Sequence, residues 1–394
     1  MRLVRYTATI LLLAVLLALE TSLSFQADGF FHSDTKKTTT YDSYKQFAAF
    51  AEDHPTLDIH FLDVGQGDST LIVAPTGESM LIDGGKPENG DDIVRYLETL
   101  GIDRLEWVVA THPDIDHIGG LIDVLESVDV EKVLDSGREH DTKTYRTYRN
   151  TIKKHDIDLF IAEEGERLNT DIADKLQVLN AYQESDVRND SSIVLHMFYK
   201  DMSVLFAGDA TILNEKEMVT KYNVNADILK VAHHGSLTST GEKFVQEVHP
   251  EIAVITYDKD NTFGHPNASV VNRLRNIGAK TFTTEQSGHI QVSLYNHHIH
   301  VSKKPWEGQG RKFPTPVPRN VQSLEPSYDM DKPVNINKAS KDDLTEIPYV
   351  SPVTAEFIVS YRKEHGPFRS KRELTRVNGV GKHTYKKIKK YITT

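Results

Sequence analysis

The chain has 394 residues, 38% of them hydrophobic, which suggests two domains with a packed core rather than one. It carries 57 acidic and 46 basic residues, a net charge of −11. The absence of cysteine excludes disulfides, thiolate metal ligands and a lipid-modified N-terminal cysteine.

The first segment has the pattern of a secretory signal. Arg2 and Arg5 precede an apolar run from Ile10 to Leu19, and a charged start before a short apolar core is typical of export signals. Residues 1–27 are therefore predicted to be a signal peptide, or an anchor if uncleaved, and residues 28–56 an N-terminal tether. Since no later segment approaches the length of a membrane-spanning helix, we expect a secreted or extracytoplasmic protein with no transmembrane pore of its own.

From residue 57 to residue 302, apolar strand-like runs alternate with helical segments, which predicts sheets covered by helices. Four of the apolar runs end in residues that commonly bind metals. A layered α/β fold builds sites at the carboxyl ends of its strands in this way. The four endings are Asp83-Gly84-Gly85, His112-Pro113-Asp114-Ile115-Asp116-His117, Gly208-Asp209 and His233-His234-Gly235-Ser236.

The second ending holds two His and two Asp within six residues. A buried strand that ends in a tight loop would bring these side chains to one point. Carboxylates packed so closely repel one another, and a divalent metal ion is the usual remedy. A solvated polar loop is the alternative, but a following helix would favour one Asp rather than four ligand-type residues in this order. The pattern therefore predicts a metal site.

In combination, these motifs resemble the metallo-β-lactamase superfamily of binuclear metallohydrolases. In the usual loop of that superfamily a second His stands where this chain has Asp114. That change, together with the opening His60-Phe61-Leu62-Asp63-Val64-Gly65-Gln66-Gly67-Asp68-Ser69, most resembles the extracytoplasmic hydrolase domain of the ComEC competence proteins, over residues 57–302. The resemblance implies an α/β domain with a four-layer αββα fold.

The resemblance also implies two divalent metal ions. They would be Zn²⁺, the superfamily's commonest ion, or Mn²⁺, which the harder Asp114 ligand favours. His112 and Asp114 would hold one ion and Asp116 and His117 the other, with Asp209 as the bridge and His234 as a further ligand.

Four other assignments complete the expected site. Asp116 would also act in catalysis by orienting the attacking water, and Asp83 would brace the loop through hydrogen bonds. His233 is expected behind or beside the ligands. Asn189 lies where the superfamily usually has another His, and would fill a coordination position or contact the substrate. His265 would protonate the leaving oxygen, although an isolated His is equally often a packed residue.

Residues 303–333 contain six prolines and little apolar sequence, which predicts an extended, stiff linker. The charge changes sign across it. Residues 334–394 carry thirteen Lys or Arg and six Asp or Glu, whereas the rest of the chain carries 33 and 51. A basic module suggests a polyanionic partner, although charge alone would equally fit an ordinary solvated helical surface.

The basic module contains the segment Gly379-Val380-Gly381-Lys382, which allows a more specific prediction of its function. Residues 334–394 resemble the paired helix-hairpin-helix domain of the ComEA competence proteins, a small all-α domain. In that motif backbone N–H groups at the start of a helix hold a DNA phosphate without reading bases. The first hairpin departs from the pattern, because Tyr349-Val350-Ser351 replaces Gly-apolar-Gly. One hairpin is therefore expected to bind DNA and the other to complete the fold.

These features lead to one functional expectation and two alternatives. The leading hypothesis is an exported metal-dependent phosphodiesterase or nuclease acting on DNA, either with the competence DNA-uptake machinery or in extracellular DNA degradation. Because fold resemblance does not fix the substrate, a cell-wall phosphodiesterase resembling phosphorylcholine esterases is an alternative. The other alternative is a DNA-binding surface protein whose metal domain is inactive, which the full ligand set disfavours.

Overall fold

The structure is a computed structural model that describes residues 37–41, 54–182, 185, 187–311, 333–345, 347, 350, 352–377, 380, 385–386 and 388–394. The predicted signal segment and most of the predicted tether and linker lie outside these residues. Within the described parts of the chain, we find no helix that is both long and apolar enough to cross a membrane.

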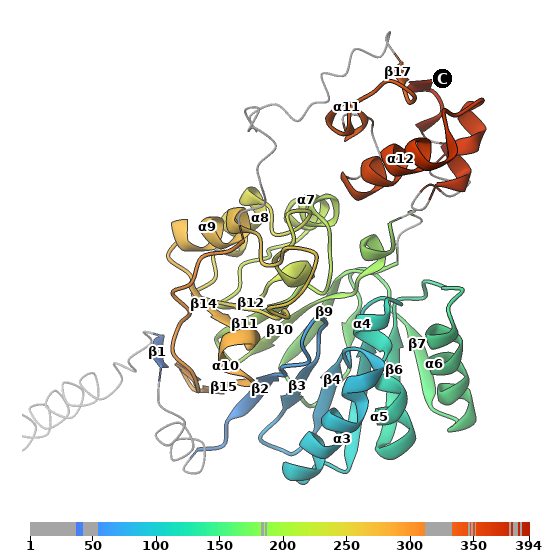
Figure 1. The fold of residues 1–394 in the computed structure, drawn as a ribbon. Coiled ribbons are helices and arrows are strands. Elements are labelled where there is room, and N and C mark those ends of the chain that lie inside the picture. Colours follow the sequence, from blue (N-terminus) through green and yellow to red (C-terminus); the bar gives the residue numbers. More distant parts are fainter. Residues whose placement is uncertain are drawn as a thin grey trace, which may run out of the picture.

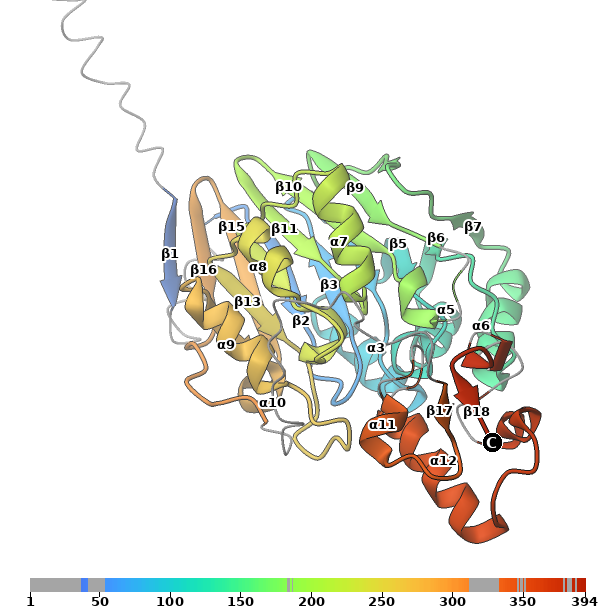
Figure 2. The same cartoon turned by 90° about the horizontal axis from the view of Figure 1, so that it is seen from above.

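Two β-sheets form the centre of the larger domain (Figures 1 and 2). The nine-stranded sheet has the order β1 (Thr38–Tyr41), β16 (His298–Val301), β15 (Ile290–Tyr295), β2 (Leu57–Phe61), β3 (Thr70–Val73), β4 (Ser79–Ile82), β5 (Arg104–Ala110), β6 (Asp129–Asp135), β7 (Asp158–Ile161). The seven-stranded sheet has the order β14 (Lys280–Thr283), β13 (Ile252–Ile255), β12 (Ile228–Lys230), β11 (Met202–Phe206), β10 (Val194–Tyr199), β9 (Lys175–Asn180), β8 (Arg167–Leu168).

Helices cover the outer face of each sheet, which confirms the predicted four-layer αββα fold. The nine-stranded sheet is covered by α3 (Gly90–Thr99), α4 (Ile115–Ile118), α5 (Leu121–Ser127) and α6 (Lys143–Lys154). The seven-stranded sheet is covered by α7 (Ile212–Lys221), α8 (Glu242–Val248) and α9 (Ala268–Asn276). Short helical turns lie at Pro87–Asn89 (η1), Arg188–Ser191 (η2), Ala232–Gly235 (η3) and Thr284–Ser287 (α10).

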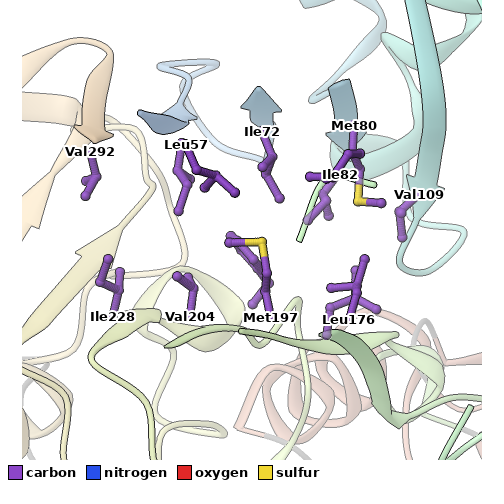
Figure 3. Packing of buried hydrophobic residues seen from close by; sticks show 14 of the residues in the cluster. Leu57, Ile72, Met80, Ile82, Val109, Leu176, Met197, Val204, Ile228 and Val292 are labelled. Carbon is purple, nitrogen blue, oxygen red and sulfur yellow. The ribbon is translucent and has the colours of Figure 1, made fainter. Parts of the chain in front are cut away.

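The largest apolar cluster lies between the two sheets (Figure 3). Ile72 and Met80 of the first sheet face Met197 and Val204 of the second, and all four are fully buried. Strands such as β4 and β11 are buried along their whole length, because one face meets the other sheet and the other face meets helices. This explains why their sequences are continuous apolar runs rather than alternating ones.

The parallel strands place the predicted ligand segments together. Strands β4, β5 and β6 are parallel to one another, and so are β11, β12, β13 and β14. The ligand motifs follow the carboxyl ends of β4, β5, β11 and β12, and the segment that contains His265 follows β13. Crevices at such carboxyl ends are the usual ligand sites of α/β sheets.

The domain is larger than the predicted span of 57–302. Strand β1 lies in the predicted tether, yet it pairs in parallel with β16. At the other end, the N–H of Trp306 donates to the carbonyl of Thr281 at 2.7 Å, and that of Arg311 to the carbonyl of Pro266 at 2.8 Å. We therefore correct the boundaries, because residues 37–41 and 303–311 are parts of this domain.

The C-terminal residues form a small domain with its own core. It contains α11 (Lys341–Thr345), α12 (Pro352–His365) and a 3₁₀ helix at Lys371–Arg376 (η5). The described core includes Ile336, Leu344, Ile358, Leu374 and Ile388, all fully buried. The expected all-α domain also has a two-stranded parallel pair, β17 (Val334–Asn335) with β18 (Ile392–Thr393), which joins the two ends of the domain.

Candidate metal centre

Closely packed backbone builds the loop that carries most of the predicted ligands. Asp114 precedes helix α4, so a single helical turn presents the following Asp116 and His117. Glycines are needed around this turn. A Cβ on Gly120 would lie 2.2 Å from the carbonyl oxygen of Gly84, and one on Gly67 would lie 2.4 Å from that of Asp116. Side chains at these glycines would push the loops apart.

The carboxylate of Asp209 lies in the middle of the cluster. Its Oδ1 is 3.5 Å from His117 Nε2 and 3.8 Å from His234 Nε2, while its Oδ2 is 3.8 Å from His112 Nε2. Two ligands of one ion lie at roughly such separations, because each is about 2 Å from the ion. The predicted bridging residue is thus between the two predicted ligand groups.

The remaining predicted ligands complete two groups. Asp114 Oδ2 is 3.9 Å from His112 Nε2, and Asp116 Oδ2 is 3.9 Å from His234 Nε2. Among the described residues, four ligand atoms are buried without any hydrogen-bond partner: His112 Nε2, His117 Nε2, His234 Nε2 and Asp209 Oδ1. Buried polar atoms without a partner are costly, and these lie within candidate ligand groups, so the donor set fits divalent metal ions.

Opposite charges stabilise the cluster electrostatically. Burial would raise the pKa of Asp209, but His233, His117 and His234 hold it well below its ordinary value. Burial would lower the pKa of His117, but Asp209 and Asp83 raise it well above its ordinary value. The carboxylate of Asp209 is therefore kept ionised, as a metal ligand must be.

Asp83 lies behind His117 and forms hydrogen bonds with it and with Thr111. Its Oδ2 accepts a hydrogen bond from His117 Nδ1 at 2.8 Å and one from the Thr111 hydroxyl at 2.7 Å. Its Oδ1 accepts from the backbone N–H of Thr111 at 2.9 Å. This bond occupies Nδ1, so Nε2 is the ring nitrogen of His117 that faces the cluster.

Sequence reasoning missed an equivalent support behind His234. His234 Nδ1 is 3.4 Å from Asp68 Oδ1 and 3.1 Å from the carbonyl of Thr256. Asp68 is in turn paired with Lys230, whose Nζ lies 2.9 Å from Oδ2, and both side chains are buried. Burial would raise the pKa of Asp68, but Lys230 and His234 lower it. A lysine inside the apolar strand β12 was the available signal.

The segment around η2 contributes a second unpredicted residue, Arg188. Its Nε and Nη2 lie 2.5 and 3.3 Å from the two carboxylate oxygens of Asp114. The neighbouring Asn189 directs its side-chain amide to Asp209 Oδ2 at 3.2 Å and to His233 Nε2 at 3.4 Å. Asn189 thus contacts the cluster through a hydrogen bond to Asp209, and its expected role as a ligand or substrate contact stays a prediction.

His233 and His265 line the same crevice. His233 Nε2 lies 3.6 Å from Asp209 Oδ2, and both His233 and His234 have positive φ values of 51° and 54°, which turn the chain sharply after β12. The ring of His265 stacks on that of His234, with centroids 6.0 Å apart. Burial and the neighbouring histidines lower the pKa of His265 to about 3, so its imidazole is neutral at pH 7.

Only Val380 of the predicted DNA-binding segment is described, and it is buried in the core of the small domain. Gly379, Gly381 and Lys382 lie outside the described residues. The assignment of this segment to phosphate binding therefore stays a prediction.

Comparison with known families agrees with this architecture. Residues 62–257 match the family model of the metallo-beta-lactamase superfamily, and residues 330–393 match that of the helix-hairpin-helix motif. The chain thus contains a metallo-β-lactamase domain followed by a helix-hairpin-helix motif. The ligand clusters described above are consistent with the divalent metals that this fold implies.

The individual relatives are competence proteins. The chain is 29% identical to ComE operon protein 3 of Bacillus subtilis, over 61% of this chain and 33% of that protein. It is 30% identical to Recombination protein 2 of Haemophilus influenzae, over 64% of this chain and 31% of that protein. The small domain is 43% identical over 60 residues to ComE operon protein 1 of B. subtilis, covering 15% of this chain and 29% of that protein.

The chain therefore spans about a third of the length of these curated relatives. Its homologues are competence proteins of the ComEC family. The two resemblances drawn from the sequence are confirmed.

Proposed function

We propose that this protein is an exported phosphodiesterase that cleaves DNA with two divalent ions, Zn²⁺ or Mn²⁺, and that its C-terminal domain holds the substrate. The main support is one observation: buried ligand atoms without partners form a cluster in the same chain as a helix-hairpin-helix domain. Export is inferred from the N-terminal signal pattern.

The ligands are divided between the two ions, with Asp209 shared by both. One ion would be held by His112, Asp114 and Asp209, and the other by Asp116, His117, His234 and Asp209. When bound, such a pair of ions acidifies a water molecule and neutralises charge on phosphoryl oxygens.

Supporting residues would keep the site ready. Asp83 and Asp68 orient the rings of His117 and His234 through their Nδ1 atoms, so that no reorganisation is needed when substrate arrives. Asp116 is partly exposed, with 23% of its side chain accessible, so it can accept a hydrogen bond from the attacking water. Asn189 and His233 would fix the orientation of Asp209.

His265 would assist the leaving oxygen. As a neutral imidazole it can donate an N–H hydrogen bond to that oxygen. Acting as the proton donor requires a higher pKa than in the free protein, which the negative charge of a bound phosphate would provide.

In the C-terminal domain, Gly379, Gly381 and Lys382 would bind DNA phosphates through backbone N–H groups and positive charge, independently of base sequence. Competence DNA uptake or extracellular DNA degradation would then supply the substrate. The competing substrate is a cell-wall phosphodiester such as phosphorylcholine on teichoic acid.

A single set of assays tests the proposal. Full-length protein stripped with a chelator and reloaded with Zn²⁺ or Mn²⁺ should cleave DNA, and should leave phosphorylcholine on teichoic acid intact. Asp116→Ala and His117→Ala should abolish cleavage but keep DNA binding, because the ligands, not the C-terminal domain, are changed. Asp129→Ala is the control, since this exposed carboxylate lies at the start of β6, away from the ligand loops.

The outcomes separate the three hypotheses. Retention of more than about a tenth of the wild-type rate by either ligand variant contradicts the binuclear mechanism, since a tenfold change is only about 1.4 kcal/mol. Cleavage of teichoic acid phosphodiesters in preference to DNA favours the cell-wall alternative. DNA binding with no hydrolysis under either metal favours an inactive binding protein.

A further inference from the structure

Exposed apolar side chains lie close in the sequence to residues of the candidate metal centre. Ten large hydrophobic side chains are exposed in the described part of the chain, and four of them lie in the segments that carry the site. Isolated exposed apolar residues need no explanation, but several around one polar site indicate a surface that contacts a partly apolar ligand. The four are Ile115, Val187, Leu237 and Phe263, with exposures of 51, 47, 54 and 61%.

Each of these residues is within three positions of a residue of the site. Ile115 lies between Asp114 and Asp116, and Phe263 lies two residues before His265. They come from four separate segments of the chain, so their exposure is not the consequence of one poorly packed segment. A phosphodiester group alone would make no use of such neighbours, because its recognition needs charge and hydrogen-bond donors.

Phe263 has a geometry that favours an aromatic partner. Its ring stacks on His265, with centroids 5.6 Å apart and planes 23° from parallel. His265 in turn stacks on His234, with centroids 6.0 Å apart and planes 29° from parallel. The three rings thus form a row that runs from a predicted metal ligand to the surface. The exposed Phe263 is the outer member of this row, and a planar ring placed on it would extend the row.

A nucleotide also carries a phosphate, and a positively charged side chain that can bind it lies near the site. Arg188 is nearly half exposed and forms an ion pair with Asp114, so its guanidinium borders the cluster where a phosphate would lie. A base can stack on Phe263 only if one of its faces is free. In a duplex both faces are covered by neighbouring base pairs, whereas an unpaired nucleotide offers an open face.

We propose that the metal centre acts on single-stranded DNA, and that Phe263 stacks the base beside the phosphate that is cleaved. This inference rests on the proposed phosphodiesterase function and specifies its substrate. Stacking is indifferent to base identity because every base has a π-face, so the preference is for unpaired strands rather than for a sequence.

The experiment compares full-length variants on a single-stranded oligodeoxynucleotide, the corresponding duplex and a tetrahydrofuran strand of equal length that has no bases. Phe263→Ala should slow single-strand cleavage by roughly 5- to 150-fold, the usual effect of removing one base–aromatic stack. Phe263→Trp should retain the activity. Leu100→Ala is the matched control, because Leu100 is also exposed but precedes β5, at the opposite end of that strand from His112.

The strand without bases tests stacking directly. Wild type should cleave it at about the rate of Phe263→Ala, and Phe263→Ala should lose nothing further when the bases are removed. Bound metal, measured by elemental analysis, should be the same in all variants. Equal rates for wild type and Phe263→Ala would overturn the inference. So would metal loss in Phe263→Ala, or an equal slowing of this variant on strands with and without bases.

Binding separates this inference from the proposed nuclease function. Fluorescence anisotropy with a labelled hexathymidylate should show weaker binding by Phe263→Ala than by wild type and Leu100→Ala. If wild type cleaves no DNA with either metal, the nuclease proposal fails, while Phe263-dependent binding of the hexamer would still support base stacking. If DNA is cleaved but hexamer binding and strand preference are independent of Phe263, only the stacking inference is overturned.

Discussion

The buried pair of Asp68 and Lys230 shows how single residues prepare the candidate site. Buried ion pairs are costly to desolvate and seldom add net stability, so their position next to His234 points to a role in orienting that ring. Asp68→Asn should therefore lower metal affinity by about 10- to 100-fold, as changes behind a ligating histidine usually do. Competition with a chromophoric chelator measures this affinity.

Two further variants make that result interpretable. Asp68→Asn combined with Lys230→Met leaves no unpaired buried charge, so its fold should be retained while its metal affinity stays low. Asp58→Asn is the matched control. Asp58 also accepts a side-chain hydrogen bond, from Ser293, but it belongs to none of the candidate ligand groups. Wild-type affinity in the double variant would show that Asp68 does not support His234.

The ion pair between Arg188 and Asp114 leads to a prediction of opposite sign. The guanidinium competes with a metal ion for the carboxylate of Asp114, so Arg188→Gln should bind the ion at His112 more tightly. The gain should be up to about fivefold, because exposed ion pairs contribute at most about 1 kcal/mol. Isothermal titration with Mn²⁺ should resolve this change, and weaker binding in Arg188→Gln would contradict the prediction.

At the scale of elements, the packing of α3 on β2 affects stability at low pH. His60 of β2 is buried, with Nδ1 3.0 Å from the hydroxyl of Tyr96 on α3, and burial together with His289 lowers its pKa to about 4. The unfolded chain takes up a proton near pH 6.5 and the folded chain only near pH 4. The contribution of neutral His60 to the free energy of unfolding is therefore complete above pH 6.5 and is lost as the pH falls towards 4.

This loss can be measured by urea unfolding with a chelator present. Between pH 7.5 and 5.0, wild type should lose about 2 kcal/mol more than His60→Gln, whose side chain does not titrate. The comparison of differences cancels any direct effect of the substitution on stability. His298→Gln, at an exposed histidine, is the control. An equal pH dependence in wild type and His60→Gln would refute the assignment.

The elements also show where prediction from sequence succeeded and where it stopped. Strand β5 and its ligand loop could be predicted because an apolar run and the residues after it are neighbours in the chain. Strand β1 could not, because Thr-Thr-Thr-Tyr has little apolar content and becomes a strand only by pairing with β16, more than 250 residues later. The pairing of Asp68 with Lys230 could not be predicted either, because the two residues are 162 positions apart in the chain.

At the scale of the whole molecule, the two domains are expected to divide binding from cleavage. A chain that ends at Arg311 should hydrolyse a small aryl phosphodiester at about the wild-type rate, because the entire larger domain is retained. Its apparent affinity for long DNA should fall, and the weakening of DNA binding with rising salt should be less steep, because phosphate contacts are lost. Equal DNA handling by both forms at all salt concentrations would contradict this division.

A chain that ends at Ser302 should behave differently, because residues 303–311 support the loop of His265. Besides the backbone bond to Pro266, the Arg311 side chain donates to the carbonyl of Asn261 at 2.8 Å. Removing this segment should lower the rate on the small diester as well as on DNA. Identical rates for the chains ending at 302 and 311 would show that the segment is dispensable.

Arg311 is hydrogen-bonded to Pro266, so the segment that connects the two domains starts next to the crevice. The 21 residues from 312 to 332 span at most about 70 Å by covalent geometry. DNA held by the C-terminal domain would then be at a local concentration of about a millimolar around the crevice. After one cut, the retained fragment would meet the crevice again before it could dissociate. Degradation should therefore be processive, with short oligonucleotides appearing while most of the starting strands are still intact.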